Sequence, residues 1–180
     1  MHVRRRLLHL QALSALALAL SACGHAPPVT PEVLPALDRA RLDSLTGRQW
    51  PGDRAPIANV RRELAWLIQG GDTNQVFGVE ILVQGNRRLA VYSREVGRSG
   101  ANPVWQILDA GRLPVLSGTA RVVSRCRRGQ AEEPELFAIA APGTGDELTD
   151  IKAAWRANLT SARIEPVNRD GVRCANPGGP

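Results

Sequence analysis

Side chains suited to catalysis are scarce in this sequence of 180 residues. Its three histidines are His2, His9 and His25, so residues 26–180 contain none. That part of the chain therefore lacks the base of serine–histidine and cysteine–histidine catalysis and the usual nitrogen ligand of zinc. We expect no catalytic residue, no metal site and no cofactor, although carboxylates, Lys152 with a serine, or Tyr92 would remain available to a catalyst.

Paired carboxylates are the first of these candidates, because two of them can cleave a glycosidic bond. The acidic residues concerned are Glu132, Glu133, Glu135, Asp146, Glu147 and Asp150. The first three lie in a charged loop, and the other three suit the start of an expected helix. A Ser–Lys dyad would need a buried, uncharged Lys152, whereas its place beside apolar Ile151 favours a solvated amine. The sequence thus favours structural roles for these residues.

The first 23 residues are organised like an export signal. Met1–Arg6 is basic, and Leu7–Leu20 is a mostly apolar stretch, shorter than the roughly 20 residues of a transmembrane helix. The next residues complete the motif Leu20-Ser21-Ala22-Cys23. This motif resembles the lipobox of bacterial lipoproteins. The resemblance implies that residues 1–22 are a signal peptide and that the Cys23 thiol carries diacylglycerol, which anchors the protein to a membrane.

The residues around Cys23 bear on its destination. Gly24 stands where an aspartate retains family members at the inner membrane, so the resemblance implies an outer-membrane anchor facing the periplasm. The alternative is an ordinary secreted protein cleaved after Ser21. Residues 24–36 contain four prolines, so we expect residues 23–36 to form the lipidated cysteine and an extended tether.

With Cys23 acylated, Cys126 and Cys174 are the remaining cysteines. An exported chain enters an oxidising compartment, where an even pair usually forms a disulfide. Redox pairs are typically separated by two residues, which these are not. We expect a structural bridge that holds the C-terminal segment to the end of an expected strand.

The chain is basic, with 23 Lys and Arg against 17 Asp and Glu, but acids and bases are interleaved, which argues against a nucleic-acid partner. The densest basic cluster consists of Arg121, Arg125, Arg127 and Arg128. Such a cluster could contact an anionic glycolipid or an acidic envelope protein. It could equally be a solvated face, because a hairpin would place Glu132, Glu133 and Glu135 opposite it.

Helical spacing of apolar residues predicts the elements that would position these groups. It predicts a short helix at Leu37–Leu45 and another at Asn59–Gln69. Thr144–Glu147 fits a capping box, followed at helical spacing by Leu148, Ile151, Trp155 and Leu159. Trp105 and Trp155 are expected in the core, and Trp50 is expected to be partly exposed.

Apolar runs predict the strands. Val76–Val83 and Arg88–Arg94 flank Gly85-Asn86 and predict a hairpin with a two-residue turn. Glu95–Pro103 is expected to be a glycine-rich loop. Further strands are expected at Val104–Leu108, Thr119–Cys126, Glu135–Ala141 and Arg163–Val167.

This order predicts an α+β fold: a mostly antiparallel sheet of about five strands with one or two helices packed on one face, and one disulfide. Residues 37–174 would form one domain and residues 175–180 a disordered tail. Ala154-Trp155-Arg156 and Gly171–Cys174 are similar to segments of small uncharacterised exported proteins of proteobacteria, a likeness that implies no activity.

The sequence therefore favours a membrane-anchored periplasmic lipoprotein that acts as a non-catalytic binding or assembly module of the cell envelope. Two alternatives stay open. One is a carboxylate-dependent hydrolase of cell-wall material, and the other is an inhibitor of a wall-degrading enzyme.

Overall fold

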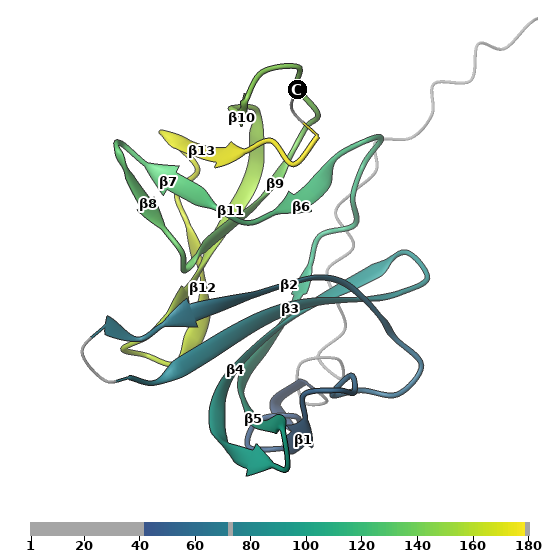
Figure 1. Cartoon of the computed structure of the whole chain (residues 1–180). Helices are drawn as coiled ribbons and strands as arrows, with labels where there is room; N and C mark the ends of the chain where they lie inside the picture. Colours follow the sequence, from purple (N-terminus) through teal and green to yellow (C-terminus); the bar gives the residue numbers. More distant parts are fainter. Residues whose placement is uncertain (1–41, 72–73, 179–180) are drawn as a thin grey trace, which may run out of the picture. The chain divides into compact units, whose positions relative to one another are not determined.

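A computed structural model describes residues 42–71 and 74–178 (Figure 1). Every described residue belongs to one compact unit, Leu34–Pro180. The expected signal peptide, Cys23 and the expected tether lie outside the described residues. Within the described ranges the regular elements are the strands β1–β13, in three antiparallel sheets. The predicted α+β class is therefore wrong, because the fold is all-β and no helix packs on a sheet.

Sheet A has five antiparallel strands in the order β1-β5-β4-β3-β2. They are β1 (Gln49–Pro51), β2 (Arg61–Gln69), β3 (Val76–Gln84), β4 (Arg87–Ser99) and β5 (Asn102–Leu113). The predicted hairpin is confirmed, since Gln84 pairs with Arg87 across the turn Gly85-Asn86. Gly85 has a φ of 62°, the left-handed conformation that such a turn requires and that glycine adopts without strain.

Both faces of sheet A are covered, which explains the nearly continuous apolar sequence of β3. Phe77, Val79 and Ile81 point to an inner core. On the outer face Leu82 belongs to a separate cluster with Trp50, Val91, Trp105 and Ile107, against which Leu45, Ile57 and Val60 pack. The segment before β2 thus covers the outer face. A strand buried on two sides loses the alternation of a half-exposed strand.

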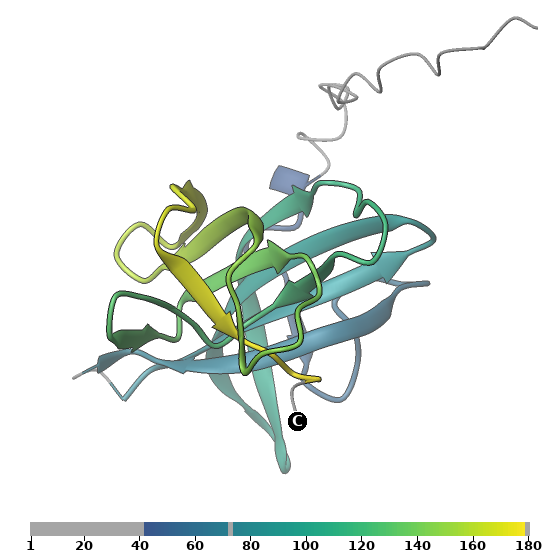
Figure 2. The ribbon, with the colours of Figure 1, turned by 90° about the horizontal axis from the view of Figure 1, so that it is seen from above.

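Two smaller sheets follow in the chain (Figures 1 and 2). Sheet B has the order β12-β11-β9-β6, and sheet C the order β10-β13-β7-β8. Sheet B comprises β6 (Arg121–Val123), β9 (Leu136–Ala140), β11 (Ile151–Asn158) and β12 (Arg163–Val167). Sheet C comprises β7 (Cys126–Arg128), β8 (Ala131–Glu133), β10 (Glu147–Leu148) and β13 (Val172–Ala175).

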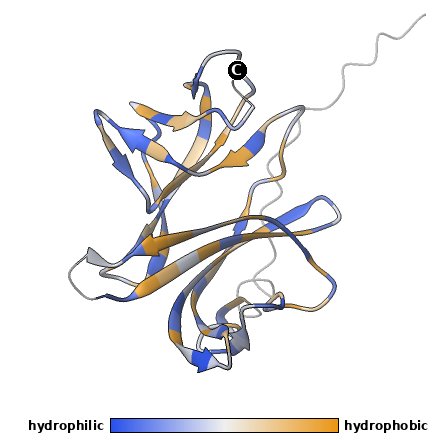
Figure 3. Ribbon diagram, in the orientation of Figure 1, coloured by the Kyte–Doolittle hydropathy of each residue, from blue (hydrophilic) through white to orange (hydrophobic). Residues whose placement is uncertain are grey.

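Strand β9 contributes to two cores. Phe137 and Ile139 join the inner face of sheet A, whereas Leu136, Ala138 and Ala140 pack with residues of sheet C. All five residues of β9 are consequently buried. Apolar residues occupy much of the facing strands in Figure 3, consistent with this layering. Sheet B is therefore the middle layer between sheets A and C.

Aromatic rings and one carboxylate join sheets A and B. Phe137 lies between Trp66 and Trp155, at ring-centroid distances of 5.5 and 5.7 Å. Asp109 of β5 accepts a 2.7 Å hydrogen bond from the backbone N–H of Ile164 in β12. These contacts bind the two sheets to one another by both apolar burial and a polar link.

The helix predicted at Asn59–Gln69 is strand β2, and a β-bulge explains the error. The register shifts between Arg62 and Leu64, after which Leu64, Trp66 and Ile68 face the inner core. Leu67, taken from the sequence as part of an apolar helical stripe, is 63% exposed. The apolar spacing of a bulged strand followed by an exposed leucine imitates that of a helix.

The helix predicted from Thr144 onward is wrong for a similar reason. Glu147–Leu148 is β10 and Ile151–Asn158 is β11, whose register shifts between Ile151 and Ala153. Ile151 and Ala154 are buried in the same cluster, three positions apart. The bulge thus reproduces a three-residue spacing without a helix. The third predicted helix, Leu37–Leu45, lies mostly outside the described residues, and its described end contains a turn in which Leu45 N–H bonds to Leu42 C=O.

The strand predictions are more accurate than the helix predictions. β3, β4, β5, β9 and β12 occupy the predicted segments, β12 with the predicted bounds. The predicted loop Glu95–Pro103 is largely strand, because β4 and β5 continue to a short turn after Ser99. The predicted strand Thr119–Cys126 is divided between β6 and β7 at Arg125, which has a φ of 56°. In the expected tail, Ala175 ends β13 and Asn176 N–H bonds to Asp146 C=O.

Candidate functional site

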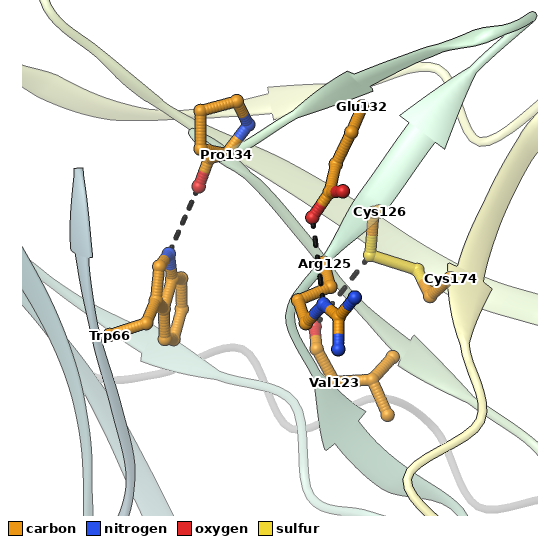
Figure 4. A network of polar contacts seen from close by, with 7 residues as sticks. All are labelled: Trp66, Val123, Arg125, Cys126, Glu132, Pro134 and Cys174. Atoms are coloured by element: carbon orange, nitrogen blue, oxygen red, sulfur yellow. Dashed lines mark hydrogen bonds and ion pairs between the residues drawn. A yellow bond between two sulfur atoms is a disulfide. The ribbon is translucent and has the colours of Figure 1, made fainter. Parts of the chain in front are cut away.

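The two cysteines expected to pair form the disulfide Cys126–Cys174 (Figure 4). They are register partners in β7 and β13, and neither side chain is exposed. Val123, Leu136 and Leu148 belong to the same buried cluster. The predicted disulfide is therefore confirmed, and its burial fits a structural role. It joins β13 to the first residue of β7, and not to the end of a strand Thr119–Cys126 as predicted.

The four arginines of the expected anionic patch are divided between two sheets. Arg121 lies in β6, Arg127 and Arg128 lie in β7, and Arg125 is between them. Arg127 is directly opposite Glu132, so the predicted pairing of this segment with the acidic one is confirmed.

Each of these arginines also has a polar partner. Arg121 donates to Asn176 Oδ1 at 2.6 Å, Arg125 Nε lies 3.6 Å from Glu132 Oε1, Arg127 Nη2 lies 2.8 Å from Glu147 Oε1, and Arg128 donates to the Asn168 carbonyl at 2.6 Å. Partners of this kind compete with an external anion for the same donors.

The acidic candidates are equally engaged. Glu133 pairs with Arg156, and Asp150 Oδ2 lies 2.8 Å from Lys152 Nζ. Lys152 is exposed, as the sequence indicated, and Ser161 donates to Glu165 at 2.6 Å instead of to a lysine. Glu132 and Glu147 also lie beside arginines, so four of the six acidic candidates form ion pairs.

Tryptophan positions differ from expectation in one case. Trp105 is buried in β5 as expected, and Trp155 packs against the core, although from a strand. Trp50 was expected to be partly exposed but is only 7% exposed. Pairing of β1 with β5 places it directly opposite Trp105, which buries both rings.

A groove of about 540 Å³ on the outer face of sheet A is the strongest candidate for a binding site. Its apolar lining includes Leu82 of β3 and Leu89 of β4, which are register partners. The segment before β2 supplies the opposite wall through Leu42, Leu45, Ile57 and Val60. This volume lies in the range of about 300–1,000 Å³ that small-molecule sites occupy.

Four arginines line the same groove: Arg48, Arg87, Arg88 and Arg112. Strand register explains part of this arrangement, since Leu89 has Leu82 on one side and Arg112 on the other. None of the described residues that line the groove is Asp or Glu. The groove, hereafter the arginine groove, thus combines an aliphatic interior with positive charge.

The arginines of the groove are held to different degrees. Arg88 donates two hydrogen bonds to Glu63, at 2.6 and 2.9 Å, and this contact raises the pKa of Arg88. Arg48 Nε donates to the Ser44 carbonyl at 3.1 Å. Arg87 is exposed and makes no ion pair with a described residue. Arg88 is opposite Leu113 of the inner core, so its side chain points away from the outer face and its charge is balanced by Glu63. Arg87 points to the same face as Leu89 and is therefore the arginine best placed to meet an anion.

Sequence reasoning missed this groove because its residues come from four separate segments of the chain. The available signal was the basic pair Arg87-Arg88 directly after the predicted turn. Arg112 lies beyond the predicted strand Val104–Leu108, and the longer β5 places it opposite Leu89.

Two buried titratable groups lie elsewhere in sheet A. Burial raises the pKa of Glu80, despite an Arg62 Nη2 at 2.9 Å. Burial, with a contribution from the charge of Glu135, raises the pKa of Tyr92 to about 12. Both groups are set within packed strands and not in the arginine groove.

No cluster of potential metal ligands occurs among residues 42–71 and 74–178. The same ranges contain no helix of the length and apolarity needed to cross a bilayer. Comparison with known proteins found no matching family model, no matching curated protein and no matching solved structure.

Proposed function

We propose that the chain is a lipoprotein anchored through Cys23 and that its folded part acts as a non-catalytic binding module of the cell envelope. The observation that carries the binding role is the arginine groove, which offers an apolar surface and positive charge in one concavity. The lipobox-like motif Leu20–Cys23 supports the anchor. The buried disulfide fits a protein that folds in an oxidising compartment.

The carboxylate pairs favour binding over hydrolysis. A glycosidase needs one carboxylic acid and one carboxylate across an open site. Here Glu133 and Asp150 are neighbours of Arg156 and Lys152, respectively. These ion pairs disfavour the hydrolase, and nothing in the described residues favours the inhibitor.

Membrane attachment is tested in native cells by fractionation and by mass spectrometry of the mature amino terminus. We expect an acylated Cys23 in the membrane fraction and a soluble periplasmic product from Cys23→Ser. Recovery of an unacylated wild-type protein in the soluble fraction would contradict the anchor.

The binding role is tested by crosslinking in whole cells followed by purification under denaturing conditions. An envelope component captured reproducibly by the wild type, and lost on Arg87→Glu, supports the proposal. Arg163→Glu is the matched control, because Arg163 is exposed on β12, in another sheet, and the charge change is the same. Equal capture by both variants would contradict a role for the groove.

A further inference from the structure

We infer that the arginine groove binds an anionic amphiphile, a molecule with one aliphatic chain that ends in a carboxylate or phosphate group. This inference rests on the proposed binding function and names the ligand class of its site. Three features of the groove support it: the aliphatic lining, the presence of arginines without Asp or Glu in the described lining, and the lack of aromatic residues there.

The interior suits an aliphatic chain. Leu82 is only 1% exposed and forms the packed base of the cluster. The apolar surface left to a ligand belongs to partly exposed lining residues, which are Leu45, Ile57, Val60 and Leu89. Covering such partly buried leucine and valine surface with an alkyl chain removes apolar area from water, at about 25 cal/mol per Å². A small hydrophilic anion would leave this part of the groove unused.

The positive charge of the groove favours an anionic head group on the ligand. Arg87 points to the same face of β4 as Leu89, and it makes no ion pair with a described residue. Arg112 is opposite Leu89 on this face. Arg88 is paired with Glu63 on the other face and adds no free charge. Guanidinium groups bind carboxylates and phosphates through paired N–H donors. A cationic head group would meet the positive charge of Arg87 and no acidic residue in the described lining, so electrostatics disfavours it.

The absence of aromatic lining distinguishes an amphiphile from a nucleotide. None of the residues that line the groove is Trp, Tyr, Phe or His. Single-stranded nucleic acids are generally held by stacking bases on such rings, in addition to basic residues. The groove offers the charge without the stacking surface, whereas an alkyl chain needs only aliphatic contact.

Isothermal titration calorimetry tests this on residues 34–180, the compact unit that contains every described strand and all three cores. The protein is produced in an oxidising compartment, and each probe is kept below its micellar concentration. We expect laurate or dodecyl phosphate to bind with one-to-one stoichiometry. Dodecyltrimethylammonium and inorganic phosphate should each bind at least about tenfold more weakly, because one lacks the anionic head and the other the chain.

Two variants locate the binding. Arg87→Glu should weaken laurate binding about tenfold or more, while Arg163→Glu should leave it unchanged. Ala58→Trp places a large ring in the lining from an exposed position and should block binding without altering charge. Melting temperatures near that of the wild type would show that each variant is folded.

Three results would overturn the inference: no binding of either anionic amphiphile, equal binding of the cationic one, or full binding by both Arg87→Glu and Ala58→Trp. Because the titration uses purified protein, its failure leaves the crosslinking and acylation experiments unaffected, and their failure leaves the titration unaffected.

Discussion

Loss of the Cys126–Cys174 bridge should destabilise the fold strongly. The two cysteines are 48 positions apart. In the chain-entropy model, a cross-link that closes a loop of about 50 residues stabilises the folded state by about 4 kcal/mol. For a domain of about 150 residues, roughly 3 °C of melting temperature corresponds to each kcal/mol, so we expect a decrease of about 12 °C.

The assay compares the oxidised protein, the reduced protein and the double variant Cys126→Ala/Cys174→Ala. Thermal and urea unfolding are followed by circular dichroism, and thiol labelling confirms the redox state. The reduced protein and the double variant should both melt well below the oxidised protein. Reductant should not change the double variant, which serves as the control for nonspecific effects.

A refutation would be a melting temperature within about 3 °C of the oxidised protein after complete reduction. That result would mean that pairing of β13 with β7 and β10 restricts the chain as effectively as the covalent bond. A lower melting temperature in the double variant alone would instead indicate a loss of core packing. Both sulfurs are fully buried, and their removal leaves a space in the surrounding cluster.

Three further outcomes follow from sheet A. Tyr92 is the only tyrosine, and its ionisation, followed by ultraviolet absorbance, should occur near pH 12. Because folding raises its pKa from 10, the free energy of unfolding should fall as pH rises from 10 through 12. Tyr92→Phe should remove both the absorbance change and this loss of stability. The raised pKa of Glu80 means that the folded state binds the proton of Glu80 more tightly, so wild-type stability should fall as pH rises above 4.5. The free energy of unfolding in urea should depend less on pH in Glu80→Gln than in the wild type. Asp109→Ala should lower stability by about 1–3 kcal/mol, because the N–H of Ile164 loses its acceptor, and Asp109→Asn should cost less in the same unfolding assay.

Local chemistry decided which elements could be predicted from the sequence. The turn at Gly85-Asn86 is specified by adjacent residues, so the β3–β4 hairpin was predictable. The bridge between Cys126 and Cys174 followed from the number of cysteines and the expected compartment. The opposition of Arg127 and Glu132 followed from complementary charge across a short loop.

Register shifts were not predictable in the same way. The bulges after Arg62 and Ile151 change which side chains face inward, and each depends on the neighbouring strand. Only that partner distinguishes a bulged strand from a helix with the same apolar spacing. The arginine groove was missed for a related reason, since Arg48, Arg87 and Arg112 come together only through the pairing of distant strands.

The covering of sheet A by the segment before β2 has a mechanical consequence. Strand β1 has three residues and lies at the sheet edge, paired only with β5, whereas β13 is covalently fastened to β7. A tensile load entering from the amino-terminal side would reach β1 and its neighbours before any other strand. Under tension the segment before β2, which forms one wall of the arginine groove, should therefore detach first. Sheets B and C should remain folded.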